Sequence, residues 1–196
     1  MPFEMGAQFA SEKRDWIIEH RQTLDRIAPA TIYNEAFPFS SRTHTIWFER
    51  RNIRCVQLVK AEGGYKMLFP LSVDINSPQA QQQIRNVIVE MLRLEARNYL
   101  PQRTAMLAGR HNLQYHSVAV KNTRSRWGSC SSTNNINLSI HLMRLPEHLS
   151  DFVILHELCH TVHKNHGAGF HQMLDYLTGG REKKLDNELK KFKIQL

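Results

Sequence analysis

The histidines of this chain are concentrated in one short segment, residues 156–171, which holds five of the eleven. His156 and His160 are four residues apart, so on a helix their side chains lie on the same face, one turn apart. Two imidazoles at this spacing can share one metal ion. Glu157 lies on the adjoining face, where a carboxylate can accept a proton from water without being a ligand. The segment therefore predicts a metal site with a general base beside it.

The alternative interpretation is that the pattern arises by chance and that both histidines are hydrogen-bonded residues of an ordinary core. The segment around them is apolar at Leu149, Phe152, Val153, Ile154, Leu155, Leu158 and Val162. A helix that is apolar around most of its circumference is central and buried. Two histidines and a glutamate inside it are costly without a purpose, and a metal ion supplies that purpose.

A catalytic zinc site usually has three protein ligands and keeps one position for water or substrate. The candidates for the third ligand are His163, His166, His171, Asp175 and Glu182. If the helix continues, His163 is displaced along its axis, whereas Gly167 lets the chain fold back and present His166. A distant carboxylate, Asp175 or Glu182, is the alternative and would make the site thermolysin-like. We predict one Zn²⁺ per chain, with Glu157 as the catalytic residue and His156, His160 and His166 as the metal ligands.

The N-terminal part of the chain has a different pattern from the rest. Residues 11–27 have helical spacing of their apolar positions and end before a proline. Residues 31–73 contain short β-rich runs, with Gly63 and Gly64 at a turn, which predicts a small antiparallel β-meander. Asn76-Ser77-Pro78 then predicts a break in regular structure. We expect residues 1–77 to form an N-terminal domain of a helix and this meander.

Residues 78–196 are expected to form the domain that holds the histidines. A long helix is predicted over residues 78–110, and strands over 114–121 and 136–142. In the second of these strands Ile136, Leu138, Ile140 and Leu142 share one face. Pro146 and Glu147 then open the helix that carries His156. The fold class is therefore α+β.

A polar loop before the second strand is the other candidate for contact with a substrate. Arg126 and Trp127 lie in this loop, and we expect the tryptophan to pack as a structural anchor. Asn137 and Ser139 line one face of the strand over residues 136–142, which could pair with an extended peptide. Arg126, Asn137 and Ser139 are thus the predicted substrate-binding residues. A donor that stabilises the oxyanion is sought among Arg126, His163, His171 and Tyr176.

The composition limits the classes of protein that this chain can be. It has 196 residues and a formal net charge of +8, which is compatible with nucleic acid as a partner without naming one. The longest strongly apolar run, residues 152–155, is far too short to span a membrane. The three cysteines form no closely spaced pair, and the N-terminus lacks the apolar core of a secretory signal. We expect a cytoplasmic protein.

Four motifs in the second half of the chain resemble those of the YgjP-like metallopeptidases and, more distantly, the SprT-like proteases. They are Arg-Ser-Arg-Trp-Gly-Ser-Cys-Ser from residue 124, Asn-Ile-Asn-Leu from 135, Val-Ile-Leu-His-Glu-Leu-Cys-His from 153, and Asn-His-Gly-Ala-Gly-Phe from 165. The resemblance covers residues 78–177. It implies zinc-dependent hydrolysis of peptide or protein substrates, and a zincin-like core in which the strand 136–142 borders the active-site groove.

The resemblance also implies that His166 is the third metal ligand, since it occupies the histidine position of the last motif. The chain departs from the family at His171, where an aromatic residue is usual, and this leaves an extra polar group near the site. The N-terminal third of the chain matches poorly, so no role in substrate selection is carried over to it.

Two other functions stay open beside the zinc peptidase. One is a metal-dependent hydrolase of a small phosphorylated substrate such as a nucleotide, with Lys121, Arg124 and Arg126 holding phosphates. The other is a nucleic-acid-associated protease, suggested by the basic charge and by the SprT-like resemblance. Steeply salt-dependent binding of DNA would favour the second.

Overall fold

The protein combines helices with two small mixed sheets, seen here in a computed structural model that describes residues 31–194 and residue 196. Residues 32–196 form a single unit. The predicted α+β class is confirmed. The predicted helix over residues 11–27 lies outside the described residues, and the domain boundary at residue 78 stays a prediction.

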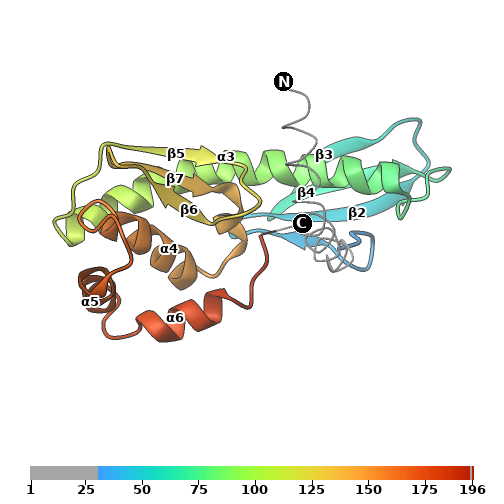
Figure 1. Ribbon diagram of the computed structural model, residues 1–196. Helices are drawn as coiled ribbons and strands as arrows, with labels where there is room; N and C mark the ends of the chain where they lie inside the picture. The colour runs from blue at the N-terminus through green and yellow to red at the C-terminus, as the bar shows by residue number, and fades with distance from the viewer. Residues whose placement is uncertain (1–30, 195) are drawn as a thin grey trace, which may run out of the picture. The chain divides into compact units, whose positions relative to one another are not determined.

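A long helix, α3 (Pro78–Arg110), runs along both sheets (Figure 1). The hydroxyl of Ser77 accepts a hydrogen bond from the amide of Ala80 at 3.3 Å, and Pro78 takes a position where its missing N–H is not needed. The predicted bounds of this helix are confirmed. None of the helices in the described part of the chain has the apolar length to cross a bilayer.

The first sheet consists of β1 (Phe39–Ser40), β2 (Thr45–Arg51), β3 (Gln57–Ala61) and β4 (Gly64–Pro70), in the order β1-β2-β4-β3. β3 and β4 form the predicted hairpin, and Gly63 in its turn has a φ of +72°. The predicted antiparallel meander is wrong, because β2 pairs with β4 in parallel. Gly64 allows this pairing, since a Cβ atom there would lie 1.9 Å from the carbonyl oxygen of Thr45.

The second sheet consists of β5 (Ser117–Lys121), β6 (Gly128–Cys130) and β7 (Asn135–Ser139), in the order β5-β7-β6. The predicted strand over residues 136–142 ends early, because the chain turns into a 3-10 helix, η1 (Ile140–Arg144). Its four apolar residues are nevertheless all buried, as predicted. β7 lies between β5 and β6, so the prediction that this strand pairs with a substrate is wrong: both of its edges are occupied.

Three helices complete the unit: α4 (Glu147–Cys159), α5 (Ala168–Leu177) and α6 (Glu182–Leu189). α4 begins at Glu147, one residue after the predicted first position, Pro146, which precedes the helix as its cap. It packs against α3, α5, α6 and β6. Nearly all of its apolar side chains are buried, which makes it the central helix of this half of the unit. Gly179 and Gly180, both with positive φ, turn the chain from α5 into α6 (Figure 1).

Candidate metal centre

Three histidine side chains meet at the C-terminal end of α4. His156 belongs to the last turn of the helix, His160 caps it, and His166 comes from the loop that leads to α5. The Nε2 atom of His166 lies 3.1 Å from the Nε2 atoms of both His156 and His160. Within the described residues, these three form the group of possible metal ligands that converges on one point. The structure therefore brings together the three histidines singled out from the sequence.

The two distances from Nε2 of His166 to the other histidine nitrogens suit a metal ion. Zinc binds histidine nitrogens at about 2.0–2.1 Å in a tetrahedron, which places two such nitrogens about 3.3 Å apart. The observed separations of 3.1 Å are close to this value. A proton can bridge one pair of these nitrogens at a time, whereas a metal ion accepts a lone pair from each. The residues present thus fit a metal ion.

The end of α4 fixes the orientation of the His160 ring. Its Nδ1 atom donates a hydrogen bond to the backbone carbonyl of His163 at 2.9 Å, which leaves Nε2 unprotonated and directed at the other two histidines. The helix tightens as it ends here, since the amides of Thr161 and Val162 donate to carbonyls three residues back, at 3.0 and 3.1 Å. His163 therefore serves the site through its backbone.

Phe170 forms a support for the three imidazoles. Its ring centroid lies 4.8 Å from that of His156 and 4.6 Å from those of His160 and His166, and the residue is 1% exposed. It belongs to the first turn of α5, which starts after Gly167. Sequence reasoning gave Phe170 no role of its own, although it closes the motif that contains His166. The position of Phe170 at the end of this motif was the feature of the sequence that could have indicated its role.

Burial keeps the imidazoles of His156 and His160 neutral. It lowers the pKa of His156 to about 4, and the nearby His160 and His166 add to this shift. Burial also lowers the pKa of His160. Both rings are therefore uncharged near pH 7, and the neutral imidazole is the form that binds a metal.

Glu157 lies outside the group of three histidines and is buried against the first residue of β6. Its side chain is so close to Gly128 that a Cβ atom there would lie 2.6 Å from Oε1 of Glu157. Burial raises the pKa of Glu157 to about 7, and the positive charge of Arg126 opposes this shift. A carboxylate with a pKa near neutrality can take up and release protons at physiological pH.

Three of the other candidates for the third ligand, His171, Asp175 and Glu182, interact with one another. Nδ1 of His171 lies 2.5 Å from Oε1 of Glu182, and the amide of Glu182 donates a hydrogen bond to Oδ1 of Asp175 at 3.2 Å. None of them belongs to the converging group. The geometry thus favours His166 over the alternative of a carboxylate ligand.

The chain matches a known family along nearly its whole length. Residues 1–192 match the family model of the YgjP-like, metallopeptidase domain. The chain belongs to the YgjP-like metallopeptidase family. It is therefore a metallopeptidase, a metal-dependent hydrolase whose substrates are peptides, as its motifs predicted.

Two solved structures are similar to this YgjP-like metallopeptidase. They are metallopeptidase zymogens, jannalysin of Methanocaldococcus jannaschii and abylysin of Pyrococcus abyssi, at 22% and 18% sequence identity. Each comparison covers 46% of this chain and 92% of the solved chain, with a TM-score of 0.41. None of the curated proteins matches the chain.

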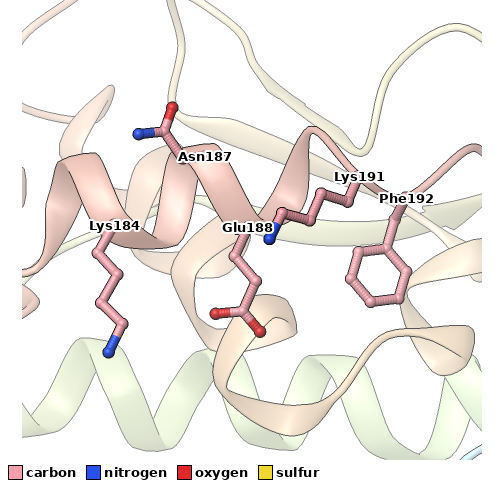
Figure 2. A pocket seen from close by; sticks show the side chains of 5 residues that line it. All are labelled: Lys184, Asn187, Glu188, Lys191 and Phe192. Carbon is pink, nitrogen blue, oxygen red and sulfur yellow. The ribbon is translucent and has the colours of Figure 1, made fainter.

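A pocket of about 260 Å³ opens beside Glu157 in this YgjP-like metallopeptidase. It is lined by Phe152, Val153, His156 and Glu157 of α4, by the segment 126–128, and by Asp186 and Leu189 of α6. A larger hollow of about 560 Å³ involves Lys184, Asn187 and Glu188 of α6 and, after the helix, Lys191 and Phe192 (Figure 2). That hollow contains none of the three histidines, whereas the smaller pocket is lined by His156, one of the three.

The predicted substrate-binding residues have different positions. Arg126 lines the pocket. The amide nitrogen of Asn137 donates to the hydroxyl of Ser129 at 3.4 Å, and its contact with a substrate stays a prediction. Ser139 is 1% exposed and its hydroxyl donates to the carbonyl of Thr123 at 3.2 Å, so the predicted contact of Ser139 with a substrate is wrong. Its hydroxyl holds the loop before β6 instead.

The two α6 residues of the pocket, Asp186 and Leu189, were not predicted from the sequence, because the local pattern around them contains no signal of such a role.

Proposed function

We propose that the protein is a zinc-dependent peptidase in which His156, His160 and His166 hold the metal ion and Glu157 is the catalytic base. The observation that supports this most directly is the convergence of the three imidazoles, in which Nε2 of His166 lies 3.1 Å from Nε2 of His156 and of His160, beside a buried carboxylate. Three imidazoles are the ligand set of a catalytic zinc that keeps one position open. A structural zinc would have four protein ligands.

Glu157 and Arg126 have different roles in the proposed hydrolysis. When bound, zinc supplies a Lewis acid that polarises a carbonyl group and activates water near neutral pH. Glu157 accepts the proton of the attacking water and then donates it to the nitrogen of the leaving amine. In the metal-free protein burial raises its pKa to about 7, and a carboxyl group in this range can take up and release a proton near neutral pH. Arg126 lies near enough to Glu157 to affect its pKa and is suited to orient the substrate.

We further infer that the peptide backbone pairs with β6 rather than with the strand proposed from the sequence. β6 is the outer strand of its three-stranded sheet within the described chain, and Gly128, its first residue, contacts Glu157. An extended peptide added at this edge would pass the catalytic carboxylate. N-methylation of single backbone amides in a substrate peptide is expected to lower kcat/KM at alternate positions. Equal tolerance at every position would contradict this pairing.

Metal content tests the proposed ligands. Wild-type protein is expected to hold close to one zinc per chain by elemental analysis, and His166→Ala is expected to lose it. Glu157→Gln is expected to keep the zinc and to lose peptide cleavage. His171→Ala is the matched control, since it removes a nearby histidine from outside the converging group. Full zinc retention in His166→Ala would place the third ligand elsewhere.

Family membership favours peptides over the alternative of a small phosphorylated substrate. Of the three cations proposed to hold phosphates, Lys121, Arg124 and Arg126, the last is the one that lines the pocket. Nothing in the described part of the chain points to nucleic acid, so that partner stays a prediction. Loss of turnover of nucleotides on removal of the three cations, with metal binding intact, would support the alternative substrate.

A further inference from the structure

The pocket beside Glu157 extends from the metal centre along the surface of α4. Phe152 and Val153 lie one helical turn before His156 and Glu157, so the four residues form one continuous strip. The other two histidines do not line the pocket, which therefore begins on the His156 side and leads away from the cluster. A group that enters it lies next to the carboxylate of Glu157.

The wall of the pocket is apolar apart from the catalytic groups and two charged residues. Phe152 and Val153 are each 4% exposed, while Trp127 and Leu189 are partly buried and pack against the hydrophobic core. Arg126 is exposed. The side chain of Asp186 is 46% exposed and pairs with Lys190 at 2.6 Å. The charges thus remain in contact with solvent, and the apolar residues form the interior.

We propose that this pocket takes the side chain of a residue that flanks the scissile bond, and that it selects bulky apolar side chains such as those of Leu, Met and Phe. The proposal rests on the proposed peptidase function of the same site. A carbonyl held between the metal centre and Glu157 places a flanking side chain at the mouth of the pocket. Since a liquid water occupies about 30 Å³, a pocket of about 260 Å³ has room for a branched or aromatic side chain.

Leu189 lines the pocket on the side of α6. It is the last residue of α6, which faces the strip of α4 across the pocket and carries no metal ligand. Leu189 can therefore be changed without altering the helix that holds His156 and Glu157. A shorter side chain at this position enlarges the pocket, and a larger one fills it.

The selectivity has a predictable order. Burial of a Leu or Phe side chain is worth about 10- to 150-fold in kcat/KM over Gly. Asp is expected to be the poorest, because its short side chain would bring a negative charge against Phe152 and Val153 and beside the carboxyl group of Glu157. Lys is expected to be intermediate, since its methylene groups can line the pocket while its ammonium group reaches Asp186.

The first experiment measures cleavage of a peptide mixture prepared by digestion of whole-cell protein. Zinc-loaded wild type is expected to cut with Leu, Met or Phe enriched at one of the two positions flanking the scissile bond. Glu157→Gln is the blank. If the wild type cuts nothing beyond this blank, the proposed peptidase function fails. Cleavage that depends on Glu157 but shows no apolar preference overturns the pocket proposal alone.

Two variants then assign the preference to the pocket. Leu189→Ala is expected to shift the preference at that position toward Trp and Tyr, and Leu189→Trp toward Gly and Ala, each by about 10-fold relative to Leu. Leu94→Ala is the matched control, because it truncates a leucine that is 62% exposed on α3. A profile that stays the same in both Leu189 variants while their zinc content and Tm are unchanged overturns the proposal.

Binding without cleavage gives a second readout. In zinc-loaded Glu157→Gln, peptides with Phe at the selected position are expected to change the fluorescence of Trp127, which lines the pocket. Peptides with Gly there are expected to bind at least 10-fold more weakly. Introduction of Trp127→Phe into the same protein should remove the signal. A signal that persists in that double variant would place the bound side chain elsewhere.

Discussion

At the scale of single residues, the site depends on the absence of a side chain at Gly128. A Cβ atom at this position would lie 2.6 to 2.9 Å from three atoms of the Glu157 side chain, so the carboxylate would have to move. A displacement of about 1 Å costs on the order of 100-fold in rate. We therefore predict that Gly128→Ala lowers kcat/KM for peptide cleavage by about 100-fold and leaves zinc binding unchanged.

Gly109→Ala is the control for this prediction, because a Cβ atom at Gly109 would meet no atom within 4 Å. It should retain wild-type activity and zinc content. A Gly128→Ala protein with wild-type kcat/KM would show that the contact with Gly128 does not fix the position of the Glu157 carboxylate.

The pKa of Glu157 predicts how the metal-free protein responds to pH. Burial raises this pKa from 4.5 to about 7, so between these values the folded protein keeps a proton that the unfolded chain has lost. The free energy of unfolding of the wild type therefore falls as the pH rises through this range, by up to about 3 kcal/mol. Glu157→Gln has no carboxyl group at this position, so its free energy of unfolding does not fall in this way.

Urea denaturation in the presence of a chelator checks this effect. The stability of Glu157→Gln relative to the wild type is expected to increase between pH 5 and pH 8. A difference that does not change with pH would contradict the raised pKa.

At the scale of elements, the sequence predicted those features that follow from the spacing of apolar residues within one segment. The long helix over residues 78–110 and the buried face of Ile136, Leu138, Ile140 and Leu142 follow from spacing alone. The pairing of β2 with β4 could not be predicted in this way. It depends on a close approach between Thr45 and Gly64, which are distant in the sequence and show no mutual pattern.

The same distinction applies to the candidate site. His156, Glu157, His160 and His166 lie within eleven consecutive residues, so the spacing on one helix and a single turn were enough to group them. Asp186 and Leu189 reach the pocket only because α6 folds back beside α4. The predicted strand pairing failed for a related reason, since the order β5-β7-β6 is a property of the folded sheet.

The short helix η1 contains a buried histidine that the chemistry does not use. His141 is 2% exposed, its Nε2 atom lies 3.1 Å from Oδ1 of Asn122, and burial lowers its pKa from 6.5 to about 4, helped by Arg144 and Arg124. Between these pH values the unfolded chain binds a proton that the folded protein does not. The free energy of unfolding is therefore predicted to fall by up to about 3 kcal/mol as the pH drops from 6.5 to 4.

His141→Gln can keep a donor to Asn122 but has no titratable group. Its stability relative to the wild type is expected to rise as the pH falls from 7 to 4.5, as measured by urea denaturation at each pH. Parallel pH profiles of the two proteins would show that folding does not lower the pKa of His141.

At the scale of the whole described unit, one hydrophobic core joins both sheets to the central helix. It runs from Tyr33 and Phe48, before the long helix, to Leu158 and Leu185 near the end of the chain. Arg42 adds a polar connection, since its guanidinium group donates to the hydroxyl of Ser150 in α4 at 2.6 Å. The helix that carries His156 and Glu157 is thus held from both halves of the unit, which keeps the metal centre in place without a substrate.

A bound metal ion is expected to stabilise the whole folded unit. The three histidines converge only in the folded protein, so the free energy of metal binding adds to the free energy of unfolding. A ligand at 1,000 times its Kd adds about 4 kcal/mol, and for a unit of this size each kcal/mol shifts Tm by about 2–4 °C. Removal of the metal by a chelator is therefore predicted to lower Tm by on the order of 10 °C.

Differential scanning calorimetry with and without a chelator measures this shift, and the variants identify its source. Glu157→Gln should respond like the wild type, because it keeps all three histidines. His166→Ala should start at a lower Tm and show little change on addition of the chelator, since two imidazoles hold zinc weakly. An equal shift in His166→Ala would mean that a metal binds with full strength without this histidine. The third ligand would then belong to another residue, and His171, Asp175 and Glu182 would be the first to test.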